Sequence, residues 1–181
     1  MEAATASRAE IASDLVHRAV RGDEAAFTRI VAEHHADMVK VSAAICGDIV
    51  IAEEAAQAAW GVAWRRMRSL RDAERLRPWL VSIAANQARD MVRRQRRHPV
   101  VELAAVDTSR SIADPAARSA DIDLRRALAG LDPEDRALVA LRYIAGIDSF
   151  ELARAMRMSA SGVRARLARI LDRLRTELGD A

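Results

Sequence analysis

Apolar residues recur three and four positions apart along almost the whole chain, and this spacing is the strongest constraint on its fold. Such spacing places the apolar side chains on one face of a helix. No valine- or isoleucine-rich alternating run occurs, and only 7 Gly and 4 Pro interrupt the 181 residues. The sequence therefore predicts an all-α fold.

Breaks in this pattern divide the first half of the chain into helices. The expected helices cover residues 10–21, 23–45, about 51–68 and about 73–97. Asp23, after Gly22, is a candidate N-cap, and His98-Pro99 ends the last helix because the residue before a proline disfavours helical geometry. The stretch that follows is rich in Ser, Thr and Pro without sustained periodicity, which predicts a flexible linker.

Helical spacing resumes after the linker over residues 121–130, 133–145, 149–156 and 160–178. Asp132 is the expected N-cap before a Pro at the first helical position, Gly146 closes the next helix, and Asp148 with Glu151 forms a capping box. Ser159 is the expected N-cap of the last helix. Two short helices joined by Arg157-Met158-Ser159 have the spacing of a helix-turn-helix. We therefore expect two small helical domains, residues 10–97 and 122–178, joined by a linker over 98–121.

Charge is distributed unevenly along the chain. Residues 10–64 hold 4 basic and 9 acidic side chains, or −5, whereas residues 65–97 hold 11 and 3, or +8. Residues 98–121 sum to −2. Separate acidic and basic surfaces indicate two kinds of partner, one of them a polyanion.

The last helix has one apolar and one basic face at 100° per residue. The apolar stripe comprises Val163, Leu167, Ile170, Leu171, Leu174 and Leu178, and the opposite side presents Ser161, Arg164, Ala165, Ala168 and Arg169, with Arg166 and Arg173 on a flank. Small residues between arginines let a helix approach the floor of a DNA groove. The alternative is a solvated face with incidental arginines. The segment Arg154–Arg175 contains 7 basic residues and 1 acidic residue, and this excess of positive charge favours the DNA-binding interpretation.

The helix before the linker repeats this arrangement. Leu76, Leu80, Ile83, Ala84, Ala88 and Met91 share one side, and Ser82, Asn86, Arg89, Arg93 and Arg96 share the other. Trp79 lies at the margin, where its ring could stack on an unpaired base or pack partly in the core. This face is a second candidate nucleic-acid surface.

The third helix combines aromatic core positions with a polar face. Trp60 and Trp64 are expected to pack in the core, whereas Glu54, Gln57, Ala58, Gly61 and Arg65 share another, exposed face. A polar face with small residues suits docking against a helix of another protein. A plain solvated face explains the same pattern equally well.

Other features exclude several classes of protein. Cys46, the single cysteine, is expected to be a buried structural thiol. His34 and His35 have no second pair of metal ligands nearby, so no metal site is expected, and no cofactor is implied. There is no basic-then-apolar leader and no apolar run of ~18 residues. The chain is expected to be cytoplasmic, without membrane insertion.

Three segments resemble the extracytoplasmic-function (ECF) sigma factors of bacterial RNA polymerase, and the resemblance covers nearly the whole chain except the N-terminal tail and the linker. AEEAAQAAWGVAW, Ala52–Trp64, resembles part of sigma region two, and RLRPWLVSIAANQARDMVRRQRR, Arg75–Arg97, resembles its helix that reads and melts the minus-ten element. Residues 127–175, ALAGLDPEDRALVALRYIAGIDSFELARAMRMSASGVRARLARILDRLR, resemble region four, whose helix-turn-helix reads the minus-thirty-five element. Ala58 and Ile51 stand where the family often has acids, and Arg157 where Gly is usual.

This resemblance implies a sigma factor, not an enzyme, that binds core RNA polymerase, directs it to promoter DNA and assists promoter melting. Glu54, Gln57 and Trp64 match family positions, and the helical faces described above complete the candidate sites. The polymerase-binding candidates are Glu54, Gln57, Gly61 and Arg65; the minus-ten candidates are Trp79, Asn86, Arg89, Arg93 and Arg96; the minus-thirty-five candidates are Ser161, Arg164, Ala165, Arg166 and Arg169. An anti-sigma factor is the usual regulator in this group.

Two other classes remain open from the residues. A DNA-binding repressor that acts without polymerase needs only the C-terminal helix-turn-helix, and it leaves the basic helix before the linker and the polar face of the third helix without a role. An enzyme is disfavoured, because the chain has no Gly-rich phosphate loop, no His-carboxylate spacing and no nucleophile motif.

Overall fold

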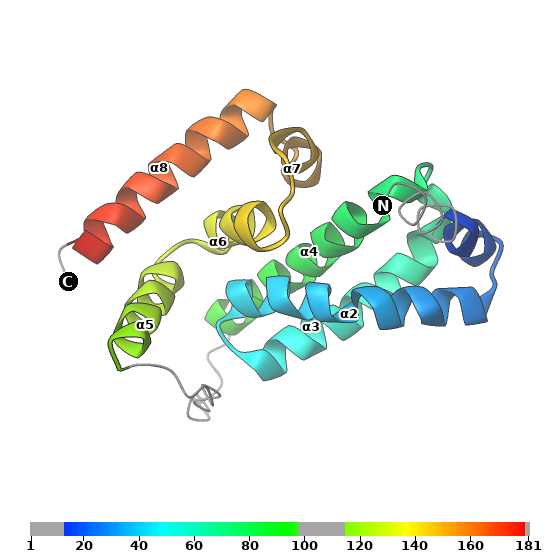
Figure 1. Cartoon of the computed structure of the whole chain (residues 1–181), viewed down its shortest axis with the longest axis horizontal. Coiled ribbons are helices and arrows are strands. Elements are labelled where there is room, and N and C mark those ends of the chain that lie inside the picture. The colour runs from blue at the N-terminus through cyan, green and yellow to red at the C-terminus, as the bar shows by residue number, and fades with distance from the viewer. Residues whose placement is uncertain (1–12, 98–114, 180–181) are drawn as a thin grey trace, which may run out of the picture.

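The computed structural model describes residues 13–97 and 115–179. All regular elements in these two ranges are helical, as the apolar spacing predicts. The helices before and after the gap form two groups that lie side by side (Figure 1). Most of the expected linker falls outside the described residues.

The first group is a bundle of three long helices, preceded by a helix over residues 13–20. Helices α2 (Glu24–Cys46), α3 (Ile49–Arg66) and α4 (Leu76–Arg97) all pack against one another (Figure 1). The buried side of α3 is built largely from Ala52, Ala55, Ala56, Ala59 and Ala63. Small side chains at the contact let helix axes approach closely, so this alanine face allows a compact bundle.

Local capping explains where these helices begin. Asp23 Oδ1 accepts a hydrogen bond from the Ala26 N–H at 3.0 Å, which confirms the predicted N-cap of α2. Asp48 Oδ1 accepts from the N–H groups of Val50 and Ile51, so α3 begins two residues before the expected start. Two 3₁₀ turns, η1 (Met67–Ser69) and η2 (Ala73–Arg75), separate α3 from α4.

The second group contains α5 (Pro115–Ala129), α6 (Pro133–Val139), α7 (Ser149–Met156) and α8 (Ala160–Gly179). A π-helical turn, η3 (Ala140–Ile144), continues α6, and Gly146 follows it with φ 69°. A positive φ at this position suits glycine, as the sequence predicts. Helix α5 begins at Pro115, six residues before the expected start, because proline is well accommodated in a first helical turn.

Helices α7 and α8 form the predicted helix-turn-helix. Arg157 ends α7 in the left-handed conformation, with φ 54° and ψ 45°, the only positive φ at a non-glycine residue in the described chain. The Gly162 N–H donates to Ser159 Oγ at 3.0 Å, which confirms the predicted N-cap of α8. Asp132 occupies the predicted N-cap position before α6, but its side chain makes no capping bond.

The two groups are not isolated from one another. Buried side chains of both belong to one continuous apolar cluster, and α6, η3 and α7 all contact α4. Arg77 of α4 donates from Nε to Asp37 Oδ2 at 2.7 Å and from Nη1 to the carbonyl oxygen of Ala145 at 2.6 Å. The described structure is therefore a closed arrangement of the two helical groups.

Candidate nucleic-acid and polymerase interfaces

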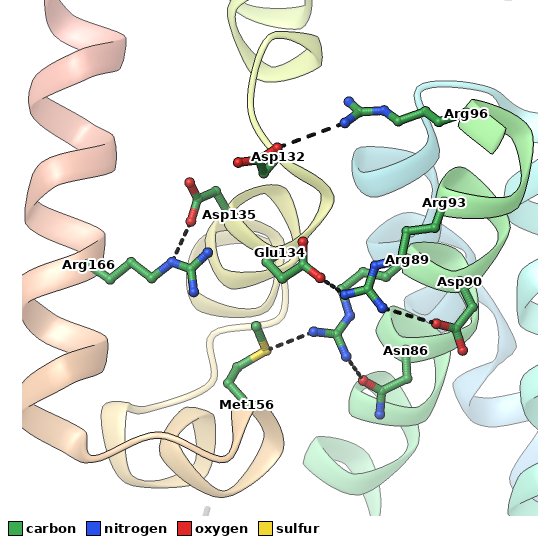
Figure 2. A network of polar contacts seen from close by, with 10 residues as sticks. All are labelled: Asn86, Arg89, Asp90, Arg93, Arg96, Asp132, Glu134, Asp135, Met156 and Arg166. Carbon is green, nitrogen blue, oxygen red and sulfur yellow. Dashed lines mark hydrogen bonds and ion pairs between the residues drawn. The ribbon is translucent and has the colours of Figure 1, made fainter.

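The basic side of α4 faces the second group of helices, which covers its centre and leaves Arg93 and Arg96 exposed. Asn86 Oδ1 accepts from Arg89 Nη2, and Arg89 Nη1 lies 3.7 Å from Met156 Sδ on α7 (Figure 2). Arg89 Nε is buried without a hydrogen-bond partner. Burial, and then the nearby positive charge of Arg93, lowers the pKa of Arg89. The centre of this face is thus partly desolvated in the closed arrangement.

The outer arginines of the same face pair with carboxylates at the start of α6. Arg93 forms ion pairs with Glu134 and, at 3.6 Å, with Asp90 of its own helix. Arg96 Nη1 lies 3.9 Å from Asp132 Oδ1 (Figure 2). The carboxylate of Asp132 therefore has an interdomain partner instead of the predicted capping role.

Trp79 lies half-buried at the N-terminal part of α4 and packs against the core cluster. It also borders a hollow of about 250 Å³, lined from the first group by Leu70, Arg75, Pro78, Trp79 and Ser82 and from α7 by Glu151, Arg154 and Ala155. Trp79 therefore packs partly against the core, and its stacking on an unpaired base stays a prediction. Ser82 Oγ donates to the Pro78 carbonyl oxygen, so this hydroxyl is engaged within α4.

The candidate DNA face of α8 is open to solvent apart from one residue. Ser161, Arg164, Ala165 and Arg169 are exposed. Arg166 is different, because its Nε donates to Asp135 Oδ1 of α6 at 2.6 Å (Figure 2). On the opposite side, Val163, Leu167, Ile170 and Leu174 are buried as predicted. Leu171 is only half-buried, and Leu178, in the last turn, is 38% exposed.

The polar face of α3 lies on the surface of the bundle. Glu54, Gln57 and Arg65 are exposed, and Gly61 is half-buried. A Cβ added to Gly61 would meet Arg65 Nη1 at 3.5 Å, so the arginine side chain lies across the glycine. The structure therefore brings these four residues together on one exposed patch.

Aromatic contacts fix α3 against α2 behind that patch. Trp60 is buried, and its Nε1–H donates to His35 Nδ1 at 3.1 Å. Trp64 departs from its predicted core position, because it remains 37% exposed while its ring packs on Phe27 at a centroid distance of 4.7 Å. The Phe27 and Trp64 rings are tilted by 56°, so this contact leaves part of the indole exposed.

Several residues of the closed arrangement were not singled out from the sequence. Glu134 pairs with Arg93 of the other group, and Arg77 donates to the Ala145 carbonyl oxygen across the two groups, whereas Asp37 pairs with Arg77 within the first group. Arg136 is 6% exposed and its Nε has no hydrogen-bond partner. An acidic run, Asp132-Pro133-Glu134-Asp135, was visible as a sequence signal. Phe150, Tyr143 and Ile144 form another missed feature, since these large apolar side chains are exposed by 73%, 56% and 47%.

The described residues hold no cluster of three or more His, Cys, Asp or Glu side chains suited to a metal ion. In the same residues, none of the helices combines the length and the apolar character needed to cross a membrane.

A helical bundle and a helix-turn-helix domain, each with an arginine-rich helix, define a two-domain DNA-binding protein. Comparison with known families makes this more specific. Residues 30–98 match sigma-70 region 2, and residues 121–174 match sigma-70 region 4. The chain belongs to the ECF sigma factors of bacterial RNA polymerase. Sigma factors direct core polymerase to promoter DNA and are initiation factors, generally not enzymes.

Similar proteins carry the same description. The chain is 31% identical over 163 residues to the RNA polymerase sigma factor CarQ of Myxococcus xanthus, with 88% of this chain and 92% of CarQ covered. It is 30% identical over 168 residues to the ECF sigma factor SigM of Mycobacterium tuberculosis, with 92% and 84% covered. A match to RfaY of Xanthomonas campestris, named as an RNA polymerase sigma factor, is 30% identical and covers 91% of this chain but 43% of RfaY.

Solved structures share the fold. CnrH, in complex with the cytosolic domain of CnrY, superposes with a TM-score of 0.70 at 23% identity, with 94% of this chain and 98% of that chain covered. RpoE of Bartonella quintana, in complex with the anti-sigma factor NepR, superposes with a TM-score of 0.65 at 19% identity, with 84% and 96% covered.

Proposed function

We propose that three surfaces divide the work of this sigma factor. The patch formed by Glu54, Gln57, Gly61 and Arg65 docks on core polymerase. The α4 face formed by Trp79, Asn86, Arg89, Arg93 and Arg96 binds the minus-ten element. The exposed face of α8, with Ser161, Arg164, Ala165 and Arg169, reads the minus-thirty-five element, and Arg166 orients that helix on α6.

This assignment rests on two arginine-rich faces, one on α4 and one on α8, in different helical groups. The polar face of α3 is a third surface, and it carries both acidic and basic side chains. Arginines on α8 can donate to guanine edges or to phosphates, and small residues between them allow close approach to the groove. On α4, a half-buried ring beside a row of arginines suits an extruded base next to its phosphates. Binding energy for extruded bases offsets about a few kcal/mol of unstacking and so favours the melted promoter.

An anti-sigma factor is the proposed regulator, supported by the two structural neighbours, of which RpoE is bound to an anti-sigma factor and CnrH to the cytosolic domain of CnrY. Core polymerase is a cytoplasmic enzyme, and we propose that this chain acts there.

Reconstitution tests the assignment. Purified chain is mixed with core polymerase that lacks any sigma factor, the complex is isolated, and transcription is measured on genomic DNA fragments. We expect initiation at promoters that neither component uses alone. Matched variants separate the surfaces: Arg164→Ala acts on promoter choice, and Glu54→Arg acts on complex formation. DNA binding without retention of polymerase would instead indicate a polymerase-independent repressor.

A further inference from the structure

Three carboxylates lie at the start of α6, Asp132 just before the helix and Glu134 and Asp135 in its first turn. We call these three residues the acidic edge. Two of them pair with arginines of the proposed minus-ten face, Asp132 with Arg96 and Glu134 with Arg93, and Asp135 pairs with Arg166, the residue that orients α8 on α6 (Figure 2). The first two arginines belong to α4 and the third to α8. One short acidic segment thus contacts the basic helices of both halves of the chain.

These contacts use the same groups that would hold DNA. Arginine binds carboxylate and phosphate through the same charge-assisted N–H donors, so a guanidinium paired with Glu134 is not free for a phosphate. The neighbouring helix adds a steric obstacle, because Arg89 lies against Met156 and α7 lines the far side of the hollow beside Trp79. While α6 and α7 lie against α4, they cover part of the surface that DNA would contact.

We propose that the acidic edge is an intramolecular competitor of promoter DNA, which keeps the minus-ten face of the free chain closed. This inference rests on the proposed function of α4. Of the three ion pairs of the acidic edge, Arg93–Glu134 and Arg96–Asp132 join the two groups, and they break when the groups separate. The Asp135–Arg166 pair lies within the second group and persists.

The closed state is held by contacts that are individually weak. The side chains of Arg93 and Glu134 are 44% and 27% exposed, and those of Arg96 and Asp132 are 50% and 76% exposed. Solvent and salt screen such pairs, so each favours closure by up to about fivefold. Arg77, which joins Asp37 to the Ala145 carbonyl oxygen, adds a third tie. Docking on polymerase can therefore open the chain, and the affinity for DNA rises with the open fraction.

The test uses the full chain with the double substitution Asp132→Asn and Glu134→Gln. The matched control is Asp172→Asn with Glu177→Gln, which removes the same charge from exposed residues paired only within α8. Spin labels on exposed Arg94 and Thr176, in a Cys46→Ser background, report the separation of the two groups. Binding is measured with a fluorescent single-stranded DNA of mixed sequence at low, fixed salt.

We expect the double variant to shift the label distances toward separation and to bind DNA about five- to twentyfold more tightly than the control. Circular dichroism checks that α6 remains folded, and Arg93→Glu combined with Glu134→Arg should restore the closed distances. Unchanged distances, or DNA binding that rises no more than in the control, overturns the inference. If closure by the acidic edge is overturned in this way but holoenzyme with the wild-type chain transcribes normally, the proposed function stands. If no holoenzyme forms and Arg93→Ala leaves DNA binding unchanged, the closure and the proposed function both fail.

Discussion

Nε of Arg166 donates to Oδ1 of Asp135 at 2.6 Å, which ties the helix-turn-helix to α6. Both side chains are largely buried, with 31% and 21% exposed. Arg166→Ala should therefore lower the free energy of unfolding by about 1 kcal/mol, because it removes a charge-assisted hydrogen bond from a partly buried carboxylate. Urea denaturation measures this loss. Arg164→Ala, on the exposed face, is the control and should leave the midpoint unchanged; equal loss from both would contradict a structural role for Arg166.

Arg164 and Arg169 should affect promoter recognition without affecting stability. Alanine at a base-contacting arginine should cost ~1–3 kcal/mol and relax the preference at one upstream position, whereas alanine at a phosphate-contacting arginine should weaken binding evenly and reduce the salt slope by about one. Binding to the minus-thirty-five element over a range of salt separates the two. Arg175→Ala, at an exposed residue paired with Asp172, is the control. Unchanged upstream binding after both substitutions would remove α8 as the DNA reader.

Glu54→Arg should weaken the complex with core polymerase. The side chain is exposed, so reversing its charge changes the docking patch without disturbing the packing of α3. Circular dichroism should show the same helical content, and affinity is measured by titration of labelled chain with core polymerase. Glu33→Arg reverses an exposed charge on α2 as a matched control. Equal affinity of the two variants would mean that the α3 patch takes no part in docking.

Arg157→Gly should raise stability. A left-handed residue with a side chain costs about 1–2 kcal/mol, and glycine removes this cost while adding about 0.4–1 kcal/mol of unfolded-state entropy, which leaves a net gain of roughly 0.5–1 kcal/mol. Thermal unfolding monitors the change. Arg157→Ala removes the charge but keeps the strained φ, and it should show no gain; a gain with alanine would attribute the effect to charge.

Cys46 should be unreactive in the folded chain. Burial raises the pKa of its thiol from 9.0 to about 11, so the reactive thiolate is scarce at neutral pH. Labelling with a thiol reagent at pH 8 should be slow until urea unfolds the protein. Because the folded pKa lies above the unfolded value, the protonated thiol contributes stability below pH 9 that is lost as pH rises toward 11. Cys46→Ala should lack this part of the pH dependence; identical urea midpoints against pH for both proteins would contradict it.

The sequence by itself predicted the features that depend on neighbouring residues. The spacing of Val163, Leu167 and Ile170 defined the buried side of α8, because helical geometry alone brings such residues together. Asp23 and Ser159 were recognised as caps, because a capping bond joins atoms only three residues apart. The paired motifs of region two and region four also identified the family.

Tertiary structure decided which polar side chains meet. Asp132 has the sequence position of a cap, yet its carboxylate lies near Arg96, thirty-six residues earlier in the chain. Arg93 and Arg166 look alike in a helical projection, but one contacts α6 across the two groups and the other within the second group. No local pattern encodes such partners, because an ion pair between distant segments depends on how whole helices dock, and docking is set by the buried apolar cluster that both groups share.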